Sequence, residues 1–425
     1  MKKTTIILAF AAILACSCNS MLELYPHNGV SPDAVTEDDV PQLRIGMYWK
    51  VQELPTRTTY ILNDLLGANL TLKGSNSTLS LINSTLSPQS SVVEDGWTGC
   101  YKALYQVNNV YSIACNLPDG KSKDQILGEC HYFRAWLHLL LVTHWGDAPL
   151  MKKNTVSDVA RTSAELIWQF VEEEIALAEE LLPEGSDYYY LTKNAATALM
   201  ARIMLYRGNN SEAVRLAESL ISNPRYKLDS FDNIFRASAN SETIFAFKCG
   251  TSDGSGITLS TMFYSYNHPN KGSYIYQPAP DVMNSLFEDT DTRKGMTITT
   301  LDNLNFINKY PSGQTGSDPV IVSRLAEMYL ISAEAQGPEL GIGRLNDLRR
   351  ARGLSDIFPG SKAAFDDALM LERRREFVCE GHRYYDLVRT GRAVSELGIQ
   401  PYQQILPVPE SELQNNSLLT QNENY

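Results

Sequence analysis

The sequence has few cysteines that could pair with one another. Of its seven cysteines, two lie within the first eighteen residues, and the other five show no C-x-x-C spacing. An odd number without close pairs argues against a disulfide framework and against a zinc site. We therefore expect no metal centre, and we expect buried free thiols at the remaining positions: Cys100, Cys115, Cys130, Cys249 and Cys379.

The chain also lacks a surplus of positive charge. It carries 37 Lys and Arg residues against 49 Asp and Glu, a formal net charge of −12 at pH 7, and no basic run. Nucleic acid and anionic membrane surfaces are therefore poor partners. With 43% hydrophobic residues over 425 positions, the sequence has ample material for a large core.

Catalytic signatures are absent as well. The sequence contains no G-x-S-x-G elbow, H-E-x-x-H motif, phosphate loop or dinucleotide-binding fingerprint. His131, His138 and His144 fall on one predicted helix, but that helix is apolar nearly all round, which favours hydrogen-bonded core histidines over metal ligands. We therefore expect no enzymatic activity and no cofactor.

No apolar run is long enough to span a membrane, but the first one has the form of a signal-peptide core. Lys2 and Lys3 precede the run 6–15, which ends in the small-residue sequence ILACSC. A cysteine directly after such a run is typical of a bacterial lipobox, in which the chain is cleaved and the cysteine is lipidated. Cys16 and Cys18 are the two candidates; an ordinary secretory signal is the alternative. Membrane attachment, if present, is then by lipid.

The part of the chain that follows contains a small repeat. After a predicted helix over about 40–54, the stretch 60–96 is rich in Asn, Ser, Thr and Leu. Asn69, Asn76 and Asn83 recur at every seventh position, but glycine and the many Ser and Thr residues argue against a stable helix. We predict a long exposed loop, and long loops are more often functional than not.

Apolar residues at helical spacing predict helices through most of the remaining chain. The predicted helices cover about 97–115 and 124–144, a segment opened by a capping box at 162–165, then 194–206, 211–221 and a pair over 320–352. Such helix pairs are typical of tetratricopeptide-like units, which stack into a solenoid. We predict a mostly α fold with repeats over about 97–222 and 320–393. A loop-rich insertion over about 223–319 separates them, with a strand at 241–249.

Tyrosines crowd into one segment of this insertion. Tyr264, Tyr266, Tyr274 and Tyr276 lie among Asn, Ser, Gly and Pro residues. Tyrosines on a loop are costly to expose unless they contact something. Two interpretations remain open: the rings pack onto the helices, or they form a stacking platform for a ligand.

The most highly charged stretch is 371–393. Glu372, Glu376 and Glu380 would share one face of a helix, and apolar residues between them indicate that the segment is at least half buried. Nearby arginines are candidates to neutralise them: Arg373, Arg375 and Arg383. Carboxylates held ionised on one helix do not straddle a scissile bond, so we interpret the segment as a structural clamp rather than an active site.

Several stretches together resemble the SusD/RagB family of Bacteroidetes outer-membrane nutrient-binding lipoproteins. The resemblance covers nearly the whole chain, and six motifs occur in the family's order. They are CNSMLELYP (18–26), WTGCYKALYQVNNV (97–110), GECHYFRAWLHLLLVTHWGDAPL (128–150), the D-x-R element Asp291 and Arg293, the late repeat RLAEMYLISAEA with LNDLRRARGL, and the charged helix LERRREFVCEGHRYYDLVRTG. The tail from Leu406 to Tyr425 is similar as well.

The resemblance implies a single SusD-like domain over 18–425 after a leader over 1–17, with Cys18 favoured over Cys16 for lipidation. It also implies tethering at the outer membrane, facing the cell surface, and capture of an oligosaccharide or other nutrient for a SusC-like TonB-dependent transporter, without chemical change. Two other classes stay open on the residues alone. One is a helical-repeat adaptor that binds a protein partner, and the other is a surface glycoside hydrolase.

The resemblance also directs attention to the ligand-binding residues. Family members often carry stacking aromatics in the loop before the helix that starts near Trp97, but 61–96 has no Phe, Tyr or Trp here. Stacking is therefore expected from the four tyrosines of the insertion, Tyr264, Tyr266, Tyr274 and Tyr276. Hydrogen bonds are expected from Asn69, Asn76 and Asn83.

Overall fold

The computed structural model describes residues 35–53, 57–250 and 259–425. Within these ranges the fold is mostly α-helical with a few short strands, which confirms the predicted fold class. The predicted leader and its candidate lipidation residues, Cys16 and Cys18, lie outside the described residues. None of the described helices is long and apolar enough to cross a membrane.

The stretch that the sequence predicted as a long exposed loop is folded. The prediction is wrong because Ser77 caps a helix here, its Oγ accepting from Ser80 N (3.2 Å). Inside this helix the Thr85 hydroxyl is satisfied by the Leu81 carbonyl (2.8 Å) and needs no contact with water. The Leu81 side chain is buried. The elements up to this point are η3 (Glu37–Asp39), α2 (Val40–Val51), α3 (Arg57–Leu66), β1 (Leu70–Leu72) and α4 (Thr78–Thr85).

Five longer helices follow, and each packs against the next. They are α5 (Ser91–Cys115), α6 (Lys121–Trp145), α7 (Ala164–Leu181), α8 (Lys193–Tyr206) and α9 (Asn210–Ile221). Helix α6 is buried on nearly all sides between α5 and α7, as its sequence predicted. The predicted capping box at 162–165 is wrong, because Asp147 Oδ1 accepts from Ala164 N (2.8 Å) and caps α7 instead.

The middle of the chain contains short helices and three two-stranded antiparallel sheets, β1–β3, β2–β6 and β4–β5. The predicted strand at 241–249 is confirmed by β2. The elements are α10 (Phe231–Arg236), β2 (Thr243–Phe247), η5 (Ser260–Met262), β3 (Tyr276–Pro278), α11 (Pro280–Asn284), α12 (Lys294–Thr297), β4 (Ile298–Leu301), β5 (Leu304–Ile307), η6 (Gly313–Thr315) and β6 (Val320–Arg324).

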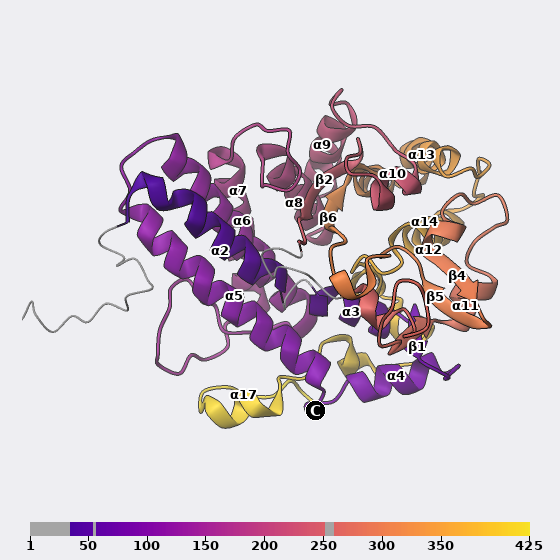
Figure 1. The fold of residues 1–425 in the computed structure, drawn as a ribbon, viewed down its shortest axis with the longest axis horizontal. Coiled ribbons are helices and arrows are strands. Elements are labelled where there is room, and N and C mark those ends of the chain that lie inside the picture. The colour runs from indigo at the N-terminus through magenta and orange to yellow at the C-terminus, as the bar shows by residue number, and fades with distance from the viewer. Residues whose placement is uncertain (1–34, 54–56, 251–258) are drawn as a thin grey trace, which may run out of the picture.

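The C-terminal part returns to helices and packs against the first stack. Helix α13 (Leu325–Ala351) contacts α9 and is interrupted at Gly337, whose φ of 71° breaks the helix before Pro338. The remaining elements are α14 (Lys362–Phe377), α15 (Arg383–Arg389), α16 (Ala393–Leu397), η7 (Pro401–Gln404) and α17 (Glu410–Asn415). Figure 1 shows α2, α5, α6 and α7 at one side of the molecule and β1, β4, β5 and α11 at the other.

The histidines of α6 are buried and hydrogen-bonded within the core. Nδ1 of His138 lies 2.8 Å from the Arg134 carbonyl, and Nδ1 of His144 lies 2.8 Å from the Leu140 carbonyl. Burial lowers the pKa of both histidines to about 4. His131 contacts a carboxylate of α7, Glu174, at 2.8 Å. These contacts fit the prediction of core histidines.

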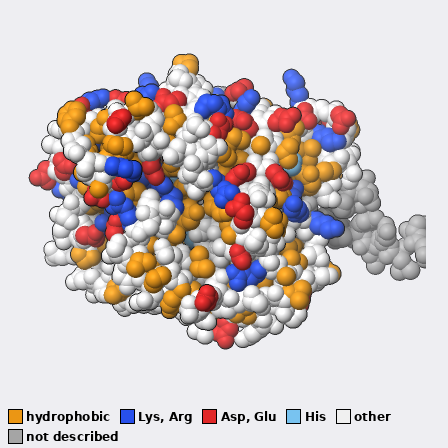
Figure 2. Space-filling view, turned by 180° about the vertical axis from the view of Figure 1, so that it is seen from behind, with side chains coloured by type: hydrophobic (Ala, Val, Ile, Leu, Met, Phe, Trp, Pro, Cys, Tyr) orange, Lys and Arg blue, Asp and Glu red, His pale blue; other side chains and the backbone are white. Residues whose placement is uncertain are grey.

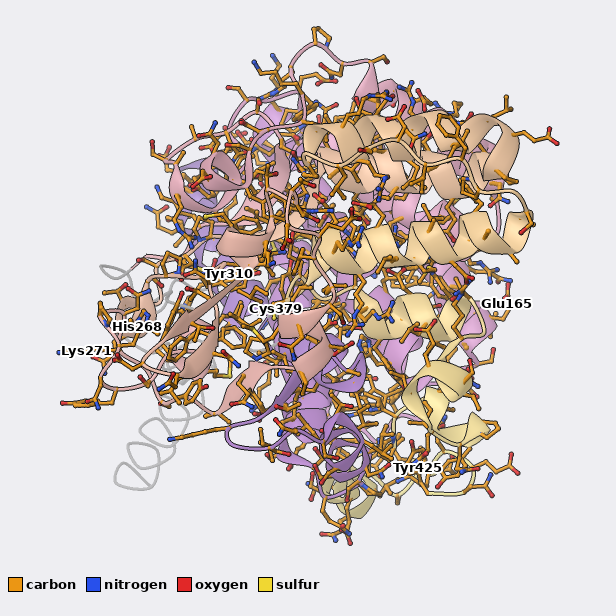
Figure 3. The ribbon with its side chains drawn as sticks, turned by 90° about the vertical axis from the view of Figure 1, so that its right-hand side faces the viewer. Glu165, His268, Lys271, Tyr310, Cys379 and Tyr425 are labelled. Carbon is orange, nitrogen blue, oxygen red and sulfur yellow. The ribbon has the colours of Figure 1, made fainter. Side chains whose placement is uncertain are left out.

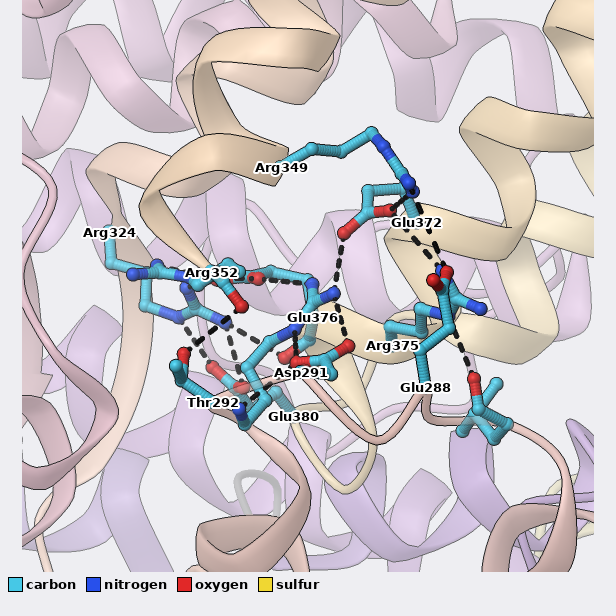
Figure 4. A network of polar contacts seen from close by, with 12 residues as sticks. Glu288, Asp291, Thr292, Arg324, Arg349, Arg352, Glu372, Arg375, Glu376 and Glu380 are labelled. Carbon is cyan, nitrogen blue, oxygen red and sulfur yellow. Dashed lines mark hydrogen bonds and ion pairs between the residues drawn. The ribbon is translucent and has the colours of Figure 1, made fainter. Parts of the chain in front are cut away.

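A buried ion network surrounds Glu376 on α14 (Figure 4). The Glu376 carboxylate accepts from Arg293 Nη1 (2.8 Å), from Arg352 Nη2 (2.8 Å) and from Arg324. Arg324 and Arg352 also share Glu242, at 2.8 and 2.9 Å. Three guanidinium groups from different segments therefore meet one carboxylate.

Two further carboxylates extend the network. Arg293 Nη2 lies 2.6 Å from Glu372 Oε1, and Arg349 Nη1 donates to Glu372 Oε2 (2.9 Å). On the other side Lys309 Nζ donates to Glu380 Oε1 (2.5 Å). The network thus joins α14 to α13, to the loop before α12 and to the segment after β5.

The cations that neutralise these carboxylates are not the ones that the sequence suggested. Arg373 pairs with Asp386 (2.8 Å) and Arg383 with Glu396 (2.7 Å), both outside the network. Arg375 lies on the same helix as Glu372, but its Nη1 is 3.8 Å from Glu372 Oε2. The helix also ends at Phe377, so the third carboxylate lies in the following turn. The predicted carboxylates do join α14 to other segments, but the cations that pair with them come from distant parts of the sequence.

The network lowers the pKa of two of its carboxylates, Glu376 and Glu380. Burial disfavours the charged form of Glu376, but Arg352, Arg324 and Arg293 outweigh it and hold the pKa well below its ordinary value of 4.5. The pKa of Glu380 is also lowered, because neighbouring cations again outweigh burial. An enclosed, permanently ionised carboxylate is a poor general acid, so we interpret the network as structural.

We expect Glu376→Gln to lower the free energy of unfolding by about 3–5 kcal/mol at pH 7, because three buried guanidinium groups lose their shared counter-charge. The pKa of Glu376 is lowered on folding, so its contribution is complete above pH 4.5 and is lost as the pH falls below that value. Urea denaturation across this range should show the gap between variant and wild type shrinking as the pH falls.

The matched control is Glu212→Gln on α9, which removes an exposed ion pair with Arg215 (2.6 Å). Exposed pairs contribute at most about 1 kcal/mol, so this variant should stay close to wild type. Equal losses in the two variants would contradict the structural importance of the network.

Candidate functional site

The structure brings two of the predicted segments side by side. Strand β1 pairs with β3 so that Leu70 lies opposite Pro278 and Leu72 opposite Tyr276. Beyond the strands, Lys73 N donates to the Ile275 carbonyl (3.0 Å). The asparagine-rich segment and the tyrosine segment are therefore neighbours, although about two hundred residues separate them in sequence.

A third segment completes this surface. Ser273 N donates to the Thr261 carbonyl (2.6 Å) and Ile275 N to the Met262 carbonyl (2.8 Å). Residues 70–76, 261–268 and 271–277 thus form a connected unit, which we call the tyrosine-loop surface. Figure 3 shows His268 and Lys271 of this unit at the edge of the molecule, away from α13 and α14.

Three of the four predicted tyrosines are buried. The Tyr264 ring stacks on Phe306, with ring centroids 5.8 Å apart, and Tyr264 OH donates to Asn308 Oδ1 (3.0 Å). Tyr274 OH donates to the Asn305 carbonyl (2.9 Å). Burial raises the pKa of Tyr264 to about 12. A buried ring cannot offer its face to a ligand, so the packing interpretation fits Tyr264, Tyr274 and Tyr276.

Tyr266 is the exception among the four. Its side chain is 71% exposed, on the turn that the hydrogen bond from Gly272 N to the Ser265 carbonyl (3.2 Å) closes. Leu72 and Ile275 are also exposed on this surface, and Lys73 Nζ lies 5.5 Å from the centroid of the Tyr274 ring. Tyr266 is therefore the predicted tyrosine that is placed to stack on a ligand.

The predicted asparagines also differ in position. Asn76 and Asn83 are exposed, on the loop after β1 and on α4. Asn69 is buried: its Nδ2 donates to Asp64 Oδ1 (2.8 Å), and its Oδ1 accepts from Arg374 Nε (2.8 Å). Asn69 therefore fixes the start of β1 and does not face solvent.

Asp64, the partner of Asn69, connects this surface to the turn after α14. Its Oδ1 also accepts from Cys379 N (2.8 Å). Burial raises the pKa of Asp64 to about 6, although the hydrogen bonds from Asn69 and the backbone oppose this. The tyrosine-loop surface is thus anchored, through one buried carboxylate, beside the ion network.

A pocket that the sequence analysis did not predict lies beside α2. It has a volume of about 240 Å³ and is lined by the aromatic side chains Tyr48, Trp49, Tyr189 and Tyr190 together with Ile45, Gly46, Gln52 and Lys248. We call it the aromatic pocket. Two features of the sequence could have indicated this pocket. One is the run of three tyrosines at 188–190, and the other is Trp49, which does not belong to the buried face of α2.

Neither the charge on the rear face nor the potential metal ligands among the described residues indicate another functional site. Figure 2 shows acidic and basic side chains interspersed over the rear face, with neither sign gathered in one patch. Among the described residues, no group of three or more His, Cys, Asp and Glu side chains could hold a metal ion.

Two family models match the chain. One, described as "Starch-binding associating with outer membrane", matches residues 22–205, and the other, described as "SusD family", matches residues 281–404. Together the two models cover more than half of the chain and leave residues 206–280 between them unmatched. The chain belongs to the SusD/RagB family.

Relatives and solved structures agree with this assignment. SusD-like protein P38 from Formosa agariphila is 24% identical over 90% of each chain, and starch-binding protein SusD from Bacteroides thetaiotaomicron is 32% identical over 31% of this chain and 26% of its own. A laminarin-binding SusD-like protein has a TM-score of 0.78 at 22% identity, covering 92% of this chain and 100% of its own. Surface glycan-binding protein A from Bacteroides thetaiotaomicron, in complex with laminarihexaose, has a TM-score of 0.78 at 21% identity and the same coverage. The structural likenesses establish a shared fold.

We expect Tyr264→Ala to destabilise the protein by about 3 kcal/mol, because it leaves a cavity beside Phe306 and removes the hydrogen bond to Asn308. Thermal denaturation measures the loss. Tyr266→Ala, two residues away, removes an exposed ring and should change the melting temperature little. If Tyr266→Ala lowered the melting temperature more than Tyr264→Ala, the described burial of the two side chains would be wrong.

Proposed function

We propose that the protein binds an oligosaccharide at the tyrosine-loop surface. The observation that carries the proposal is Tyr266, whose ring is 71% exposed on a surface held by three hydrogen-bonded segments. The family is described as starch-binding, and the laminarin-binding and laminarihexaose-bound proteins share this fold over their full length. Both facts support a glycan as the ligand.

The chemistry of the surface suits a sugar. A pyranose ring has an apolar C–H face, which stacks on an aromatic side chain, and a rim of hydroxyl groups, which take hydrogen bonds. Tyr266 supplies the exposed ring, while the exposed side chains of Asn76 and Lys73 supply donors. Asn83 on α4 is a more distant candidate. The buried Asn69 acts in this proposal as a positioning residue for β1.

The surface is proposed to bind and not to cleave. Glu376 on α14 and Glu380 in the turn after it lie inside the ion network, and their pKa values are lowered, so neither is suited to protonate a glycosidic oxygen. We therefore propose a binding protein and not a hydrolase.

We expect Tyr266→Ala to weaken oligosaccharide binding roughly ten-fold, about 1.4 kcal/mol, because the sugar loses its stacking partner. Isothermal titration with laminarihexaose, maltohexaose and cellohexaose measures the change. Tyr105→Ala on α5, which also removes an exposed tyrosine, is the matched control and should bind as wild type.

Unchanged affinity in a folded Tyr266→Ala protein would remove the tyrosine-loop surface from the binding site. Failure of the wild-type protein to bind any glycan of a broad panel would favour the adaptor alternative, in which the helical repeats bind a protein partner. Release of shortened products from a labelled polysaccharide would establish the hydrolase alternative.

We further propose that residues 18–425 form one domain, anchored by lipid at Cys18, or at Cys16, to the outer membrane and exposed at the cell surface. There it would pass the oligosaccharide to a SusC-like TonB-dependent transporter. The family description "associating with outer membrane" and the signal-peptide pattern of the first residues support this location.

We expect the wild-type chain to remain with the membrane fraction and to copurify, in mild detergent, with a TonB-dependent transporter identified by mass spectrometry. Cys18→Ser should release the chain, because the lipid attachment is lost, while Cys16→Ser serves as the paired control. Release by Cys16→Ser alone would move the anchor to Cys16. Absence of any transporter from the purified membrane-bound chain would contradict the proposed partner.

A further inference from the structure

We propose that the aromatic pocket is a second carbohydrate site, separate from the tyrosine-loop surface, which takes a single neutral pyranose ring. The inference rests on the proposed function in one respect, because it assumes that the natural ligand is a glycan.

The pocket is assembled from three separate segments. Helix α2 supplies Trp49 and is followed by Gln52, the segment before α8 supplies Tyr189 and Tyr190, and Lys248 follows β2. None of these residues belongs to the tyrosine-loop surface. The pocket is therefore a distinct place on the molecule.

Its floor is held in place by contacts within the protein. The buried Tyr48 OH donates to Glu129 Oε1 (2.9 Å) and accepts from Leu191 N (2.9 Å), which ties α2 to α6 and to the tyrosine segment. Arg44 Nε donates to Glu129 Oε2 (2.7 Å), and the Arg44 guanidinium lies 4.9 Å from the centroid of the Tyr190 ring. A prearranged site loses little conformational entropy on binding.

Trp49 is exposed in a way that the other tryptophans are not. The chain has five tryptophans, all at described positions, and four of them are buried: Trp97, Trp136, Trp145 and Trp168. Trp49 is 39% exposed and Tyr190 is 42% exposed. Two large rings, exposed together at the wall of one cavity, are typical of a binding site.

The lining selects the chemical class of the ligand. The aromatic rings offer apolar faces, and the exposed side chains of Lys248 and Tyr190 offer hydrogen bonds, which together match the two kinds of surface on a sugar ring. At about 240 Å³ the pocket lies below the roughly 300–1,000 Å³ typical of drug-sized ligands, so it admits about one ring at a time.

Cations already lie against these rings. Lys50 Nζ is 4.4 Å from the centroid of the Trp49 ring, and Lys248 Nζ is 5.7 Å from that of Tyr189. A cationic ligand would be repelled by these like charges, whereas a neutral sugar would not. The pocket therefore disfavours amines and quaternary ammonium compounds, the other ligands that aromatic cages commonly bind.

Tryptophan fluorescence gives a direct test, because acrylamide in water should quench chiefly Trp49. We expect saturating laminarihexaose, maltohexaose or cellohexaose, whichever binds in titration calorimetry, to lower the acrylamide quenching constant at least two-fold. The same protection should appear in Tyr266→Ala. The protection from quenching should be lost in Tyr190→Ala. In titration calorimetry, Trp49→Phe should bind one fewer ligand per chain than the wild type. Tyr105→Ala should behave as wild type.

The outcomes separate this inference from the proposed function. If a glycan binds with dependence on Tyr266 but quenching is unchanged, the pocket is not a site and the proposed function stands. If protection disappears in Tyr266→Ala, Trp49 reports on the first site and a separate second site is overturned. If no glycan binds to the wild type, the proposed function fails, and the inference that rests on it fails too.

Discussion

The packing of the C-terminal half depends on one shared counter-charge, the carboxylate of Glu376. Three guanidinium groups converge on it from the loop before α12, the end of β6 and the end of α13. Because the carboxylate and the three cations are all buried, α14 cannot separate from these segments without breaking several ion pairs in the interior. The stretch with the most conspicuous acidic and basic residues is therefore poorly suited to acid–base chemistry, and both proposed ligand-binding surfaces lie elsewhere.

Helical periodicity predicted α5, α6, α8 and α9 because their apolar faces are continuous in sequence. The same approach failed for α3 and α4, because it took the many Ser, Thr and Asn residues as unfavourable for a helix. In α4, Ser77 caps the helix instead, and the Thr85 hydroxyl bonds to the Leu81 carbonyl of the same helix. It could not separate Tyr264 from Tyr266 either, since the two tyrosines share the same polar surroundings in sequence. The partners of the α14 carboxylates were missed because Arg293 and Lys309 lie more than sixty residues away from them.

The two candidate surfaces differ in how they are built. The tyrosine-loop surface combines backbone hydrogen bonds between loops with one exposed ring, whereas the aromatic pocket stands on α2 and on a buried tyrosine-carboxylate-arginine contact. Loop surfaces tolerate changes of sequence more readily than helical floors do. If both proposals hold, the first surface would set the preference for a particular glycan and the pocket would add a general affinity for sugar rings.

The pairing of β1 with β3 has a consequence for folding. It joins residues about two hundred positions apart, so the loop between them must close before the sheet can form, and contacts of high sequence separation tend to form slowly. Three paired residues are also a small cooperative unit, which can open without unfolding the helices. Hydrogen exchange at these few amides would then be faster than in the helical core. The tyrosine-loop surface would be the last part of the protein to appear during folding and the first to be lost under mild denaturing conditions.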